Sequence, residues 1–379
     1  MKKIDITYVF GTGRKSKFLD SAFSNEFFYG YDLFCNEDLE VEIIELDEQR
    51  KKISTVGKFI YFMDRVLNKL SKLPFYMNEV MSYKTFRKLI KSNNIIFTND
   101  RIGISLLPLL IIIKIIRRVN SVVIVMGMLN NDSGNKLILK LQSLFLRIFI
   151  RFNNYFIFLG NGEYSDAVTK YPEYKHKFVF LPFCINTDFW DSEEKYDSTD
   201  REKTILFIGN DGNREYKKII RIAELLPDLN FTFVTSQIKS QEINLMNVNL
   251  LEGNWNKSLF SDAEIKLIYK NSLLTVLPLK NTLQPSGQSV ALQSMSMGVP
   301  VMISNSIGFW DSDNFINNEH LLILENNNLD NWVKEIKNLV NNKEKLNNLS
   351  SAGEMLIKNN YSLDYFYFGL KKMLIDVDL

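Results

Sequence analysis

The stretch "LQPSGQSVALQSMSMGVPV", residues 283–301, decides the fold. A Ser-Gly turn at Ser286 and Gly287 leads into small residues that predict a buried helix over 289–297, followed by a β-branched strand. A turn, a helix and a strand in this order form one repeat of a parallel α/β sheet. Backbone N–H groups from Ser286 to Gln288 would make a small anion-binding nest ahead of the helix. We therefore expect an anionic ligand at this turn.

The same alternation continues along the whole chain. The predicted strands are 4–10, 41–46, 94–99, 121–127, 155–160 and 178–183 in the first half, and 204–210, 230–236, 248–253, 272–279, 299–304 and 320–325 in the second. Strands that alternate with longer helical stretches predict parallel sheets with helices on both faces. The polar, acidic stretch 184–203 has no apolar periodicity and is the predicted linker. The fold class is therefore α/β, with two successive parallel-sheet domains.

Composition excludes several classes of protein. The net charge of +2 over 379 residues does not favour a nucleic acid as partner. Two cysteines and two histidines, without metal-ligand spacing, predict neither a disulfide framework nor a metal site. The short apolar run at the N-terminus does not have the pattern of a signal peptide. A cytoplasmic protein is expected.

The most apolar region, residues 105–129, is long enough to suggest a membrane span. Lys114, Arg117 and Arg118 interrupt it, and three cations within a span are costly in hydrocarbon. We expect a helix followed by a buried strand.

The stretch "FIGNDGNREYKK", residues 207–218, is a second candidate anion site. It follows a predicted strand, and Arg214, Lys217 and Lys218 bring positive charge to the start of the next helix. Arg214 can make a forked contact with phosphate oxygens, which a lysine cannot. Cations in a first helical turn oppose the helix dipole, so a nearby anion would account for them.

The turn "YVFGTGRKS", residues 8–16, is a third candidate. Gly11 and Gly13 let the backbone turn closely after the first strand and approach a phosphate or a sugar. The turn lacks the third glycine of a dinucleotide-binding fingerprint.

Residues 261–304, "SDAEIKLIYKNSLLTVLPLKNTLQPSGQSVALQSMSMGVPVMIS", resemble the donor-binding stretch of the retaining, GT-B-fold glycosyltransferases of family 4, the "glycosyl transferases group 1" type. The usual form there is a Tyr-containing helix, a strand, Glu-Pro-Phe-Gly, a Glu-Ala-Met-Ala helix, Gly and Pro-Val. The likeness extends to residues 207–218 and to "LPFCINTDFW", residues 181–190. In the first half only the order of strands and helices agrees.

The resemblance implies two Rossmann-like domains facing a cleft, with the acceptor on the first and a nucleotide sugar on the second. The expected domains are 1–187, 188–360 and a C-terminal helix within 361–379 that packs back on the first domain. The implied reaction is a metal-independent hexosyl transfer with retention, without a cofactor, from a UDP-sugar in preference to a GDP-sugar. The expected acceptor is a glycan or a lipid-linked acceptor in bacterial cell-surface polysaccharide or glycoconjugate synthesis.

Two family carboxylates are replaced in this chain. The first contacts the donor sugar and the second the nucleotide ribose, and their positions hold Gln284 and Gln293, one residue further apart than usual. A glutamine can still hydrogen-bond hydroxyls but cannot hold a charge. The expected catalytic residues are therefore Arg214 and Lys218, which stabilise the diphosphate, and Gln284, which fixes the sugar. The predicted donor-binding residues are Gly11, Gly13, Gly209, Asn210, Arg214, Lys217, Trp255, Gln284, Pro285, Ser286, Gly287, Gln288, Ser289 and Gln293.

The acceptor side is less defined by the sequence. Many members of the family place a histidine after a first-domain strand, and "VIVMGMLNNDSG", residues 123–134, has none. A backbone group at Gly127 is expected in its place, with Glu26 and Asp100 as further acceptor-binding candidates. Trp255 is expected to stack on the nucleobase.

Two other functions stay open. Because the histidine and both carboxylates are missing, the chain could be a sugar-nucleotide-binding module without transfer activity. An epimerase of the same fold is the other alternative, although few acid and base side chains surround the expected site.

The helix predicted at 136–151 carries a basic edge on an otherwise apolar surface. Its cations are Lys136, Lys140, Arg147 and Arg151. We expect an element packed in the first domain, and the alternative is peripheral docking on an anionic membrane at the inner face of the plasma membrane.

Overall fold

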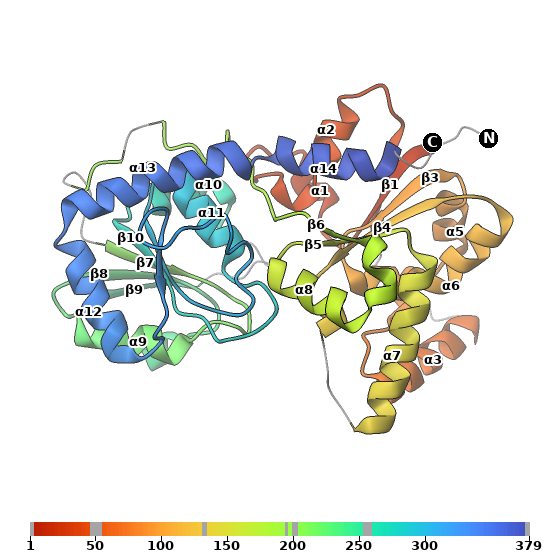
Figure 1. Cartoon of the computed structure of the whole chain (residues 1–379), viewed down its shortest axis with the longest axis horizontal. Helices are drawn as coiled ribbons and strands as arrows, with labels where there is room; N and C mark the ends of the chain where they lie inside the picture. The colour runs from red at the N-terminus through yellow and green to blue at the C-terminus, as the bar shows by residue number, and fades with distance from the viewer. Residues whose placement is uncertain are drawn as a thin grey trace. The chain divides into compact units, whose positions relative to one another are not determined.

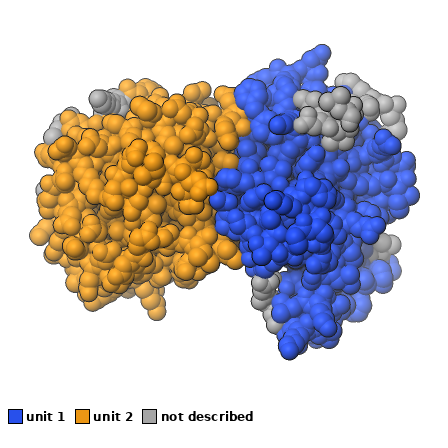
Figure 2. Space-filling view, viewed as in Figure 1, with its two compact units in different colours: residues 1–20, 27–181, 366–379 blue, residues 21–26, 182–365 orange. Residues whose placement is uncertain are grey.

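The computed structural model describes residues 4–45, 55–130, 135–193, 196–198, 204–252 and 260–375, which form two α/β units (Figures 1 and 2). Unit 1 comprises residues 1–20, 27–181 and 366–379, and unit 2 comprises residues 21–26 and 182–365. The chain thus passes into unit 2 at Leu181 and Pro182 rather than at 187–188. The short segment 21–26, which the sequence placed in the first domain, belongs to unit 2.

Each unit is built on a six-stranded parallel sheet with the strand orders β2-β1-β3-β4-β5-β6 and β12-β11-β10-β7-β8-β9. The strands of unit 1 are β1 (Ile4–Phe10), β2 (Val41–Glu45), β3 (Ser92–Phe97), β4 (Asn120–Val125), β5 (Tyr155–Phe158) and β6 (Phe178–Phe180). Those of unit 2 are β7 (Thr204–Ile208), β8 (Asn230–Val234), β9 (Val248–Leu251), β10 (Leu274–Leu277), β11 (Val301–Ser304) and β12 (Leu322–Leu324). Every predicted strand is present, which confirms the α/β class.

Helices cover the sheets (Figure 1). They are α1 (Lys15–Phe18), α2 (Tyr31–Cys35), α3 (Thr55–Ser71), α4 (Met77–Val80), α5 (Tyr83–Leu89), α6 (Asp100–Ile116), α7 (Lys136–Phe152), α8 (Asn161–Lys170), α9 (Tyr216–Leu225), α10 (Asp262–Lys270), α11 (Gln288–Ser296), α12 (Leu329–Val340), α13 (Lys343–Asn360) and α14 (Leu363–Ile375). Short 3-10 turns are η1 (Glu26–Phe28), η2 (Met128–Asn130), η3 (Pro172–Lys177) and η4 (Ser240–Glu242).

The central strands read as continuous apolar runs because helices bury both faces of the sheets. Every residue of β4, β10 and β11 is buried. Each unit has its own apolar core, with Phe149 and Phe156 edge to face in unit 1, and Phe207 and Phe233 edge to face in unit 2. A chain of 379 residues is longer than a single apolar core usually supports, which agrees with its division into two units.

The apolar region 105–129 forms the end of α6 and the buried strand β4, as predicted. Among the helices that the structure describes, none is long and apolar enough to cross a bilayer.

The last helix begins in unit 2 and continues into unit 1, with the change between Tyr365 and Phe366. In unit 1 the ring of Tyr367 lies edge to face on Phe34, with centroids 4.7 Å apart, and Lys371 forms an ion pair with Glu37. Aromatic and ionic contacts therefore hold the C-terminal helix on unit 1.

Strand order locates the binding edge of each sheet. In unit 2 the chain starts at β7, builds β8 and β9 on one side, and then returns to add β10 to β12 on the other. Ligands of open parallel sheets bind beyond the carboxyl ends of the strands at such a switch point, here between β7 and β10. The loops that follow these two strands hold residues 209–215 and 278–287.

Candidate donor-binding site

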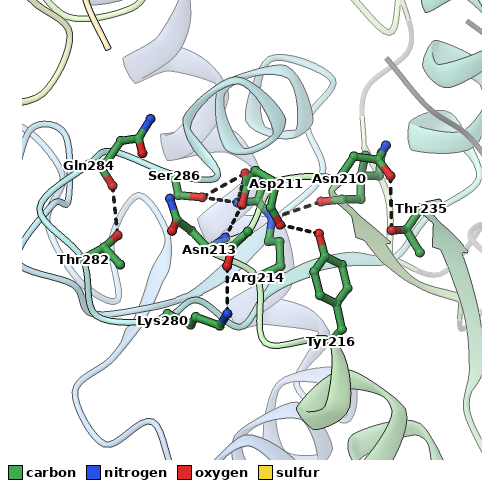
Figure 3. Close-up of polar contacts among 12 residues, drawn as sticks. Asn210, Asp211, Asn213, Arg214, Tyr216, Thr235, Lys280, Thr282, Gln284 and Ser286 are labelled. Carbon is green, nitrogen blue, oxygen red and sulfur yellow. Dashed lines mark hydrogen bonds and ion pairs between the residues drawn. The ribbon is translucent and has the colours of Figure 1, made fainter. Parts of the chain in front are cut away.

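Arg214 and Ser286 meet at the switch point of unit 2 (Figure 3). Arg214 lies in the turn after β7, and Ser286 lies in the loop after β10. The Arg214 guanidinium donates a short hydrogen bond to Ser286 Oγ, and an isolated bridge joins Arg214 to Leu279. Two stretches 72 residues apart in the sequence thus form one site.

The Arg214 side chain is buried, with 3% of the residue exposed. Its Nη1 lies 3.0 Å from Asp211 Oδ2, and Ser286 Oγ donates to the same carboxylate oxygen over 3.1 Å. Burial lowers the pKa of Arg214 from its ordinary value, while Asp211 raises it. Because a guanidinium keeps its proton in proteins, the site holds a desolvated positive charge whose partner, Asp211, has a half-exposed side chain.

Gly209 is required by the path of the Arg214 side chain. A Cβ atom at Gly209 would lie 2.5 Å from Arg214 Nε. A side chain at position 209 would collide with the Arg214 side chain, so the glycine leaves room for the guanidinium. A role for Gly209 in contacting the donor stays a prediction.

The first turn of α11 opens beside Ser286. Gly287 precedes the helix with φ +79°, a left-handed conformation that favours glycine. Its N-cap residue, Gly287, has no side chain that could cap the helix, and the first turn contains no acidic residue. The N–H groups at a helix start carry the positive end of the helix dipole, so this turn can receive an anion.

The two glutamines lie in different environments. Gln284 is exposed in the loop ahead of α11, where its backbone carbonyl accepts from Thr282 Oγ1 over 3.2 Å. Gln293 is 1% exposed, accepts from the Tyr269 hydroxyl over 3.2 Å, and donates from Nε2 to Glu26 Oε1 over 2.9 Å. Its predicted contact with a ribose would require one of these bonds to be replaced.

The other polar residues of the turn after β7 have structural partners. Asn210 Oδ1 accepts the backbone N–H of Ser236 over 2.6 Å. The Lys218 ammonium donates to the carbonyl of Asn327 over 2.7 Å, which fixes the loop after β12. Lys217 is exposed. A role for Lys218 in catalysis would require its ammonium to leave this carbonyl.

Asp100, predicted to bind the acceptor, is buried instead. The residue is 1% exposed, and its Oδ2 accepts the backbone N–H groups of Met126 and Met128 over 2.9 and 3.0 Å. The carboxylate therefore fixes the loop around Gly127, which has φ +96°. Burial raises the pKa of Asp100. Its position does not support the expected contact with an acceptor.

Glu26 also differs from the prediction. It is 1% exposed and lies in unit 2, where its carboxylate accepts from Trp190 Nε1 and Gln293 Nε2. Burial raises its pKa to about 7. A buried carboxylate with these partners is not placed to meet an acceptor hydroxyl.

The remaining predicted residues are placed as follows. Gly11 and Gly13 form the turn after β1, and Gly13 has φ +85° with open space where a side chain would lie. Trp255 lies outside the described residues. Within the described ranges, no group of three or more His, Cys, Asp and Glu side chains is arranged to hold a metal ion.

Asp211, Trp190 and Tyr269 belong to the site but were missed in the sequence. Asp211 stands three residues before Arg214, and that spacing was the available signal. No comparable signal marks Trp190 or Tyr269, because their contacts with the segment 21–26 and with α11 are long-range.

Part of the chain matches the model of a known protein family. Residues 188–355 match the family "Glycosyl transferases group 1". A search of curated protein sequences found no match.

Solved structures resemble the chain at low sequence identity. Sucrose-phosphate synthase from Thermosynechococcus elongatus superposes with a TM-score of 0.68 at 12% identity, covering 99% of each chain. HepE from Anabaena, solved with UDP-glucose, has a TM-score of 0.65 at 9% identity and covers 98% of this chain and 100% of its own. TarM from S. aureus has a TM-score of 0.57 at 14% identity, and the chain spans only about 58% of TarM.

At these identities the structural likeness establishes the fold, over the whole chain in two of the three cases. The family match covers the unit that carries Arg214, Ser286 and α11. The chain therefore has the GT-B-like fold of these structures, and its residues 188–355 match the glycosyl transferases group 1 family that the sequence resemblance predicted.

Proposed function

We propose that the chain transfers a hexosyl group from a UDP-sugar to a glycan or lipid-linked acceptor. The observation that carries the proposal is the buried Arg214 guanidinium bonded to Ser286, directly before the start of α11. HepE was solved with UDP-glucose and TarM with UDP, which supports uracil as the base of the donor.

The geometry suggests how transfer would be assisted. When the bond between the sugar and the diphosphate breaks, negative charge develops on the leaving phosphate. Arg214 and the first N–H groups of α11 are preorganised donors for that charge. A phosphate would displace the half-exposed Asp211 from the guanidinium, and Gln284 would hydrogen-bond the sugar hydroxyls.

Donor binding provides the first test. Binding of UDP should raise the melting temperature by about 5–10 °C at a ligand concentration near one hundred times its Kd, whereas GDP, ADP and CMP should have smaller effects. Incubation with UDP-sugars and an acceptor extract should then release UDP. Binding without UDP release would identify a sugar-nucleotide-binding module, and a changed sugar would identify an epimerase. A stronger effect of GDP would contradict the choice of base.

A surface of unit 1 favours a lipid-linked acceptor. Helices α3 and α7 lie side by side (Figure 1). Several large apolar side chains of these two helices are exposed. Phe59, Tyr61, Phe62, Leu137 and Leu144 are each between 51% and 66% exposed.

The charges on the same two helices are almost entirely positive. The exposed cations are Lys58, Arg65 and Lys69 on α3 and Lys136, Lys140, Arg147 and Arg151 on α7. The single acidic residue of the pair is Asp64, which is buried and accepts the backbone N–H groups of Met77 and Asn78. We call this face, formed by the listed apolar and basic residues, the α3–α7 surface.

Aromatic residues interspersed with cations are typical of surfaces that bind anionic headgroups. The basic edge predicted on 136–151 is therefore exposed, and α3 adds a second basic and apolar helix to it. Docking through the α3–α7 surface would bring the enzyme to a lipid-linked acceptor on an anionic membrane. Peripheral contact with the inner face of the plasma membrane, and a role in cell-surface polysaccharide synthesis, follow as parts of this proposal.

A further inference from the structure

A short segment from the start of the chain is built into the donor-binding unit. Residues 21–26 run along α10, where Ala263 N donates to the Ala22 carbonyl over 3.1 Å and Ser24 N donates to Asp262 Oδ2 over 2.9 Å. The segment ends at Glu26, whose side chain points into the interior of the unit. These contacts fix a carboxylate inside unit 2.

The Glu26 carboxylate is the centre of a buried hydrogen-bond chain. Its Oε1 accepts from Trp190 Nε1 over 3.1 Å and from Gln293 Nε2 over 2.9 Å, and its Oε2 forms a short bond with Ser24 Oγ. The other end of Gln293 accepts from the Tyr269 hydroxyl. Trp190, Gln293 and Tyr269 are at most 1% exposed, so water does not compete for these bonds. The chain of bonds connects α10, α11 and the segment that enters unit 2.

This environment determines which side chain residue 293 can have. Its amide offers a donor to Glu26 and an acceptor to the Tyr269 hydroxyl, which also lies 3.3 Å from the Val290 carbonyl. A glutamate would place two carboxyl groups about 2.9 Å apart in the interior, with Asp262 also nearby. Burial and the charge of Asp262 raise the pKa of Glu26 to about 7, while the bonds from Gln293 and Trp190 favour its ionised form. One acid is accommodated here, and Glu26 supplies it.

The hydrogen bond between Glu26 and Gln293 acts on α11, the helix whose first turn follows the predicted anion nest. Gln293 lies within the nine residues of α11, and the first turn of that helix stands beside Ser286 and Arg214. Because Gln293 lies in the second turn of this nine-residue helix, its hydrogen bonds also restrain the direction of the first turn.

We propose that Glu26 is a positioning residue of the donor site, and that it holds α11 in place through an interlocked pair with Gln293. The proposal rests on the proposed function for its effect on the donor, but the pairing itself can be tested without activity.

A charge exchange tests the pairing. Gln293→Glu should lower the melting temperature by about 5–10 °C, because it adds a second buried acid. Glu26→Gln should change it by no more than about 3 °C, since the new amide can still accept from Trp190 and Gln293. The double variant Glu26→Gln/Gln293→Glu restores one amide and one acid, so most of the loss should be recovered. Gln237→Glu, an exposed glutamine of the same unit, is the matched control and should have little effect.

Donor affinity tests the positioning role. Glu26→Ala should raise the KM for the UDP-sugar, and the Kd for UDP, by about tenfold with a smaller change in kcat, and Glu26→Gln should restore both. Additive melting temperatures in the exchange would overturn the pairing. A normal KM in a destabilised Glu26→Ala protein would overturn the positioning role. If the wild type binds no UDP, the proposed function fails, while the exchange still reports on the pair.

Discussion

At the scale of single residues, Arg214 is the side chain on which the proposed chemistry depends most. It is buried, its charge is matched by a half-exposed aspartate, and it contacts the loop that starts the anion nest. Arg214→Ala should therefore reduce turnover by about two to three orders of magnitude, the usual range for removing one charge-stabilising donor. Initial rates of UDP release at saturating donor would measure the loss.

Two further variants make that result specific. Arg214→Lys keeps the charge but not the planar fork, so it should recover only part of the activity. Arg221→Ala removes an exposed arginine of α9 that pairs with Glu224, and its rate should stay near that of the wild type. A loss of less than threefold for Arg214→Ala would contradict the role of the guanidinium, provided that melting curves show the variant folded.

The sequence predicted Arg214 and the Ser-Gly turn because both follow strands of a parallel sheet and carry chemistry that is unusual at a helix start. It could not predict the environments of Glu26 and Gln293. Their bond joins residues 267 positions apart, and no local pattern marks a segment that leaves one unit to pack in the other. The burial of Asp100 could not be predicted for a similar reason, since its backbone partners lie on the next strand-to-helix loop.

At the scale of elements, hydrophobic patterning was a reliable guide. Buried strands such as β4 and β10 are short apolar runs between turn residues, and parallel sheets require such runs. Helix α11 was predicted over 289–297 and spans Gln288–Ser296. The exposed face of α3 could not be identified from its sequence, because the pattern of apolar residues does not reveal which of them a neighbouring helix covers.

The α3–α7 surface leads to a prediction about membrane binding. The protein should float with vesicles that contain about one third phosphatidylglycerol and remain unbound with neutral phosphatidylcholine vesicles. Lys58→Glu/Lys69→Glu should weaken binding by roughly tenfold or more, because each basic residue near an anionic surface contributes about 1 kcal/mol. Phe59→Ala/Phe62→Ala should weaken it as well, through the loss of apolar contact.

A matched pair on α12 separates this surface from net charge. Lys334→Glu/Lys337→Glu changes the total charge equally but lies in unit 2. Equal losses from both charge reversals would show that the membrane effect is not specific to the α3–α7 surface. Flotation that is independent of anionic lipid would exclude electrostatic docking.

At the scale of the whole molecule, the buried acids make stability depend on pH. Burial raises the pKa of Glu26 to about 7, and burial together with Asp100 raises that of Glu163 to about 8. Both values lie above those of the unfolded chain, so the folded state binds more protons between pH 4.5 and 8. The contribution of these acids is fully present below pH 4.5 and is lost as the pH rises toward 8.

Glu163→Gln isolates one of these contributions. Glu163 is 0% exposed and accepts from Asn130 Nδ2, and a glutamine preserves its shape without the charge. Because the pKa of Glu163 is raised to about 8, the folded wild type loses stability as the pH rises from 5 to 8.5, whereas the variant does not. Over this range the melting temperature of the variant should therefore rise by about 5–15 °C relative to that of the wild type. The exposed substitution Glu79→Gln in the same unit should produce no such trend. Melting curves of the variant and the wild type at half-unit pH steps would test this prediction. A difference in melting temperature that stays constant with pH would show that the pKa of Glu163 is the same in the folded and unfolded chains.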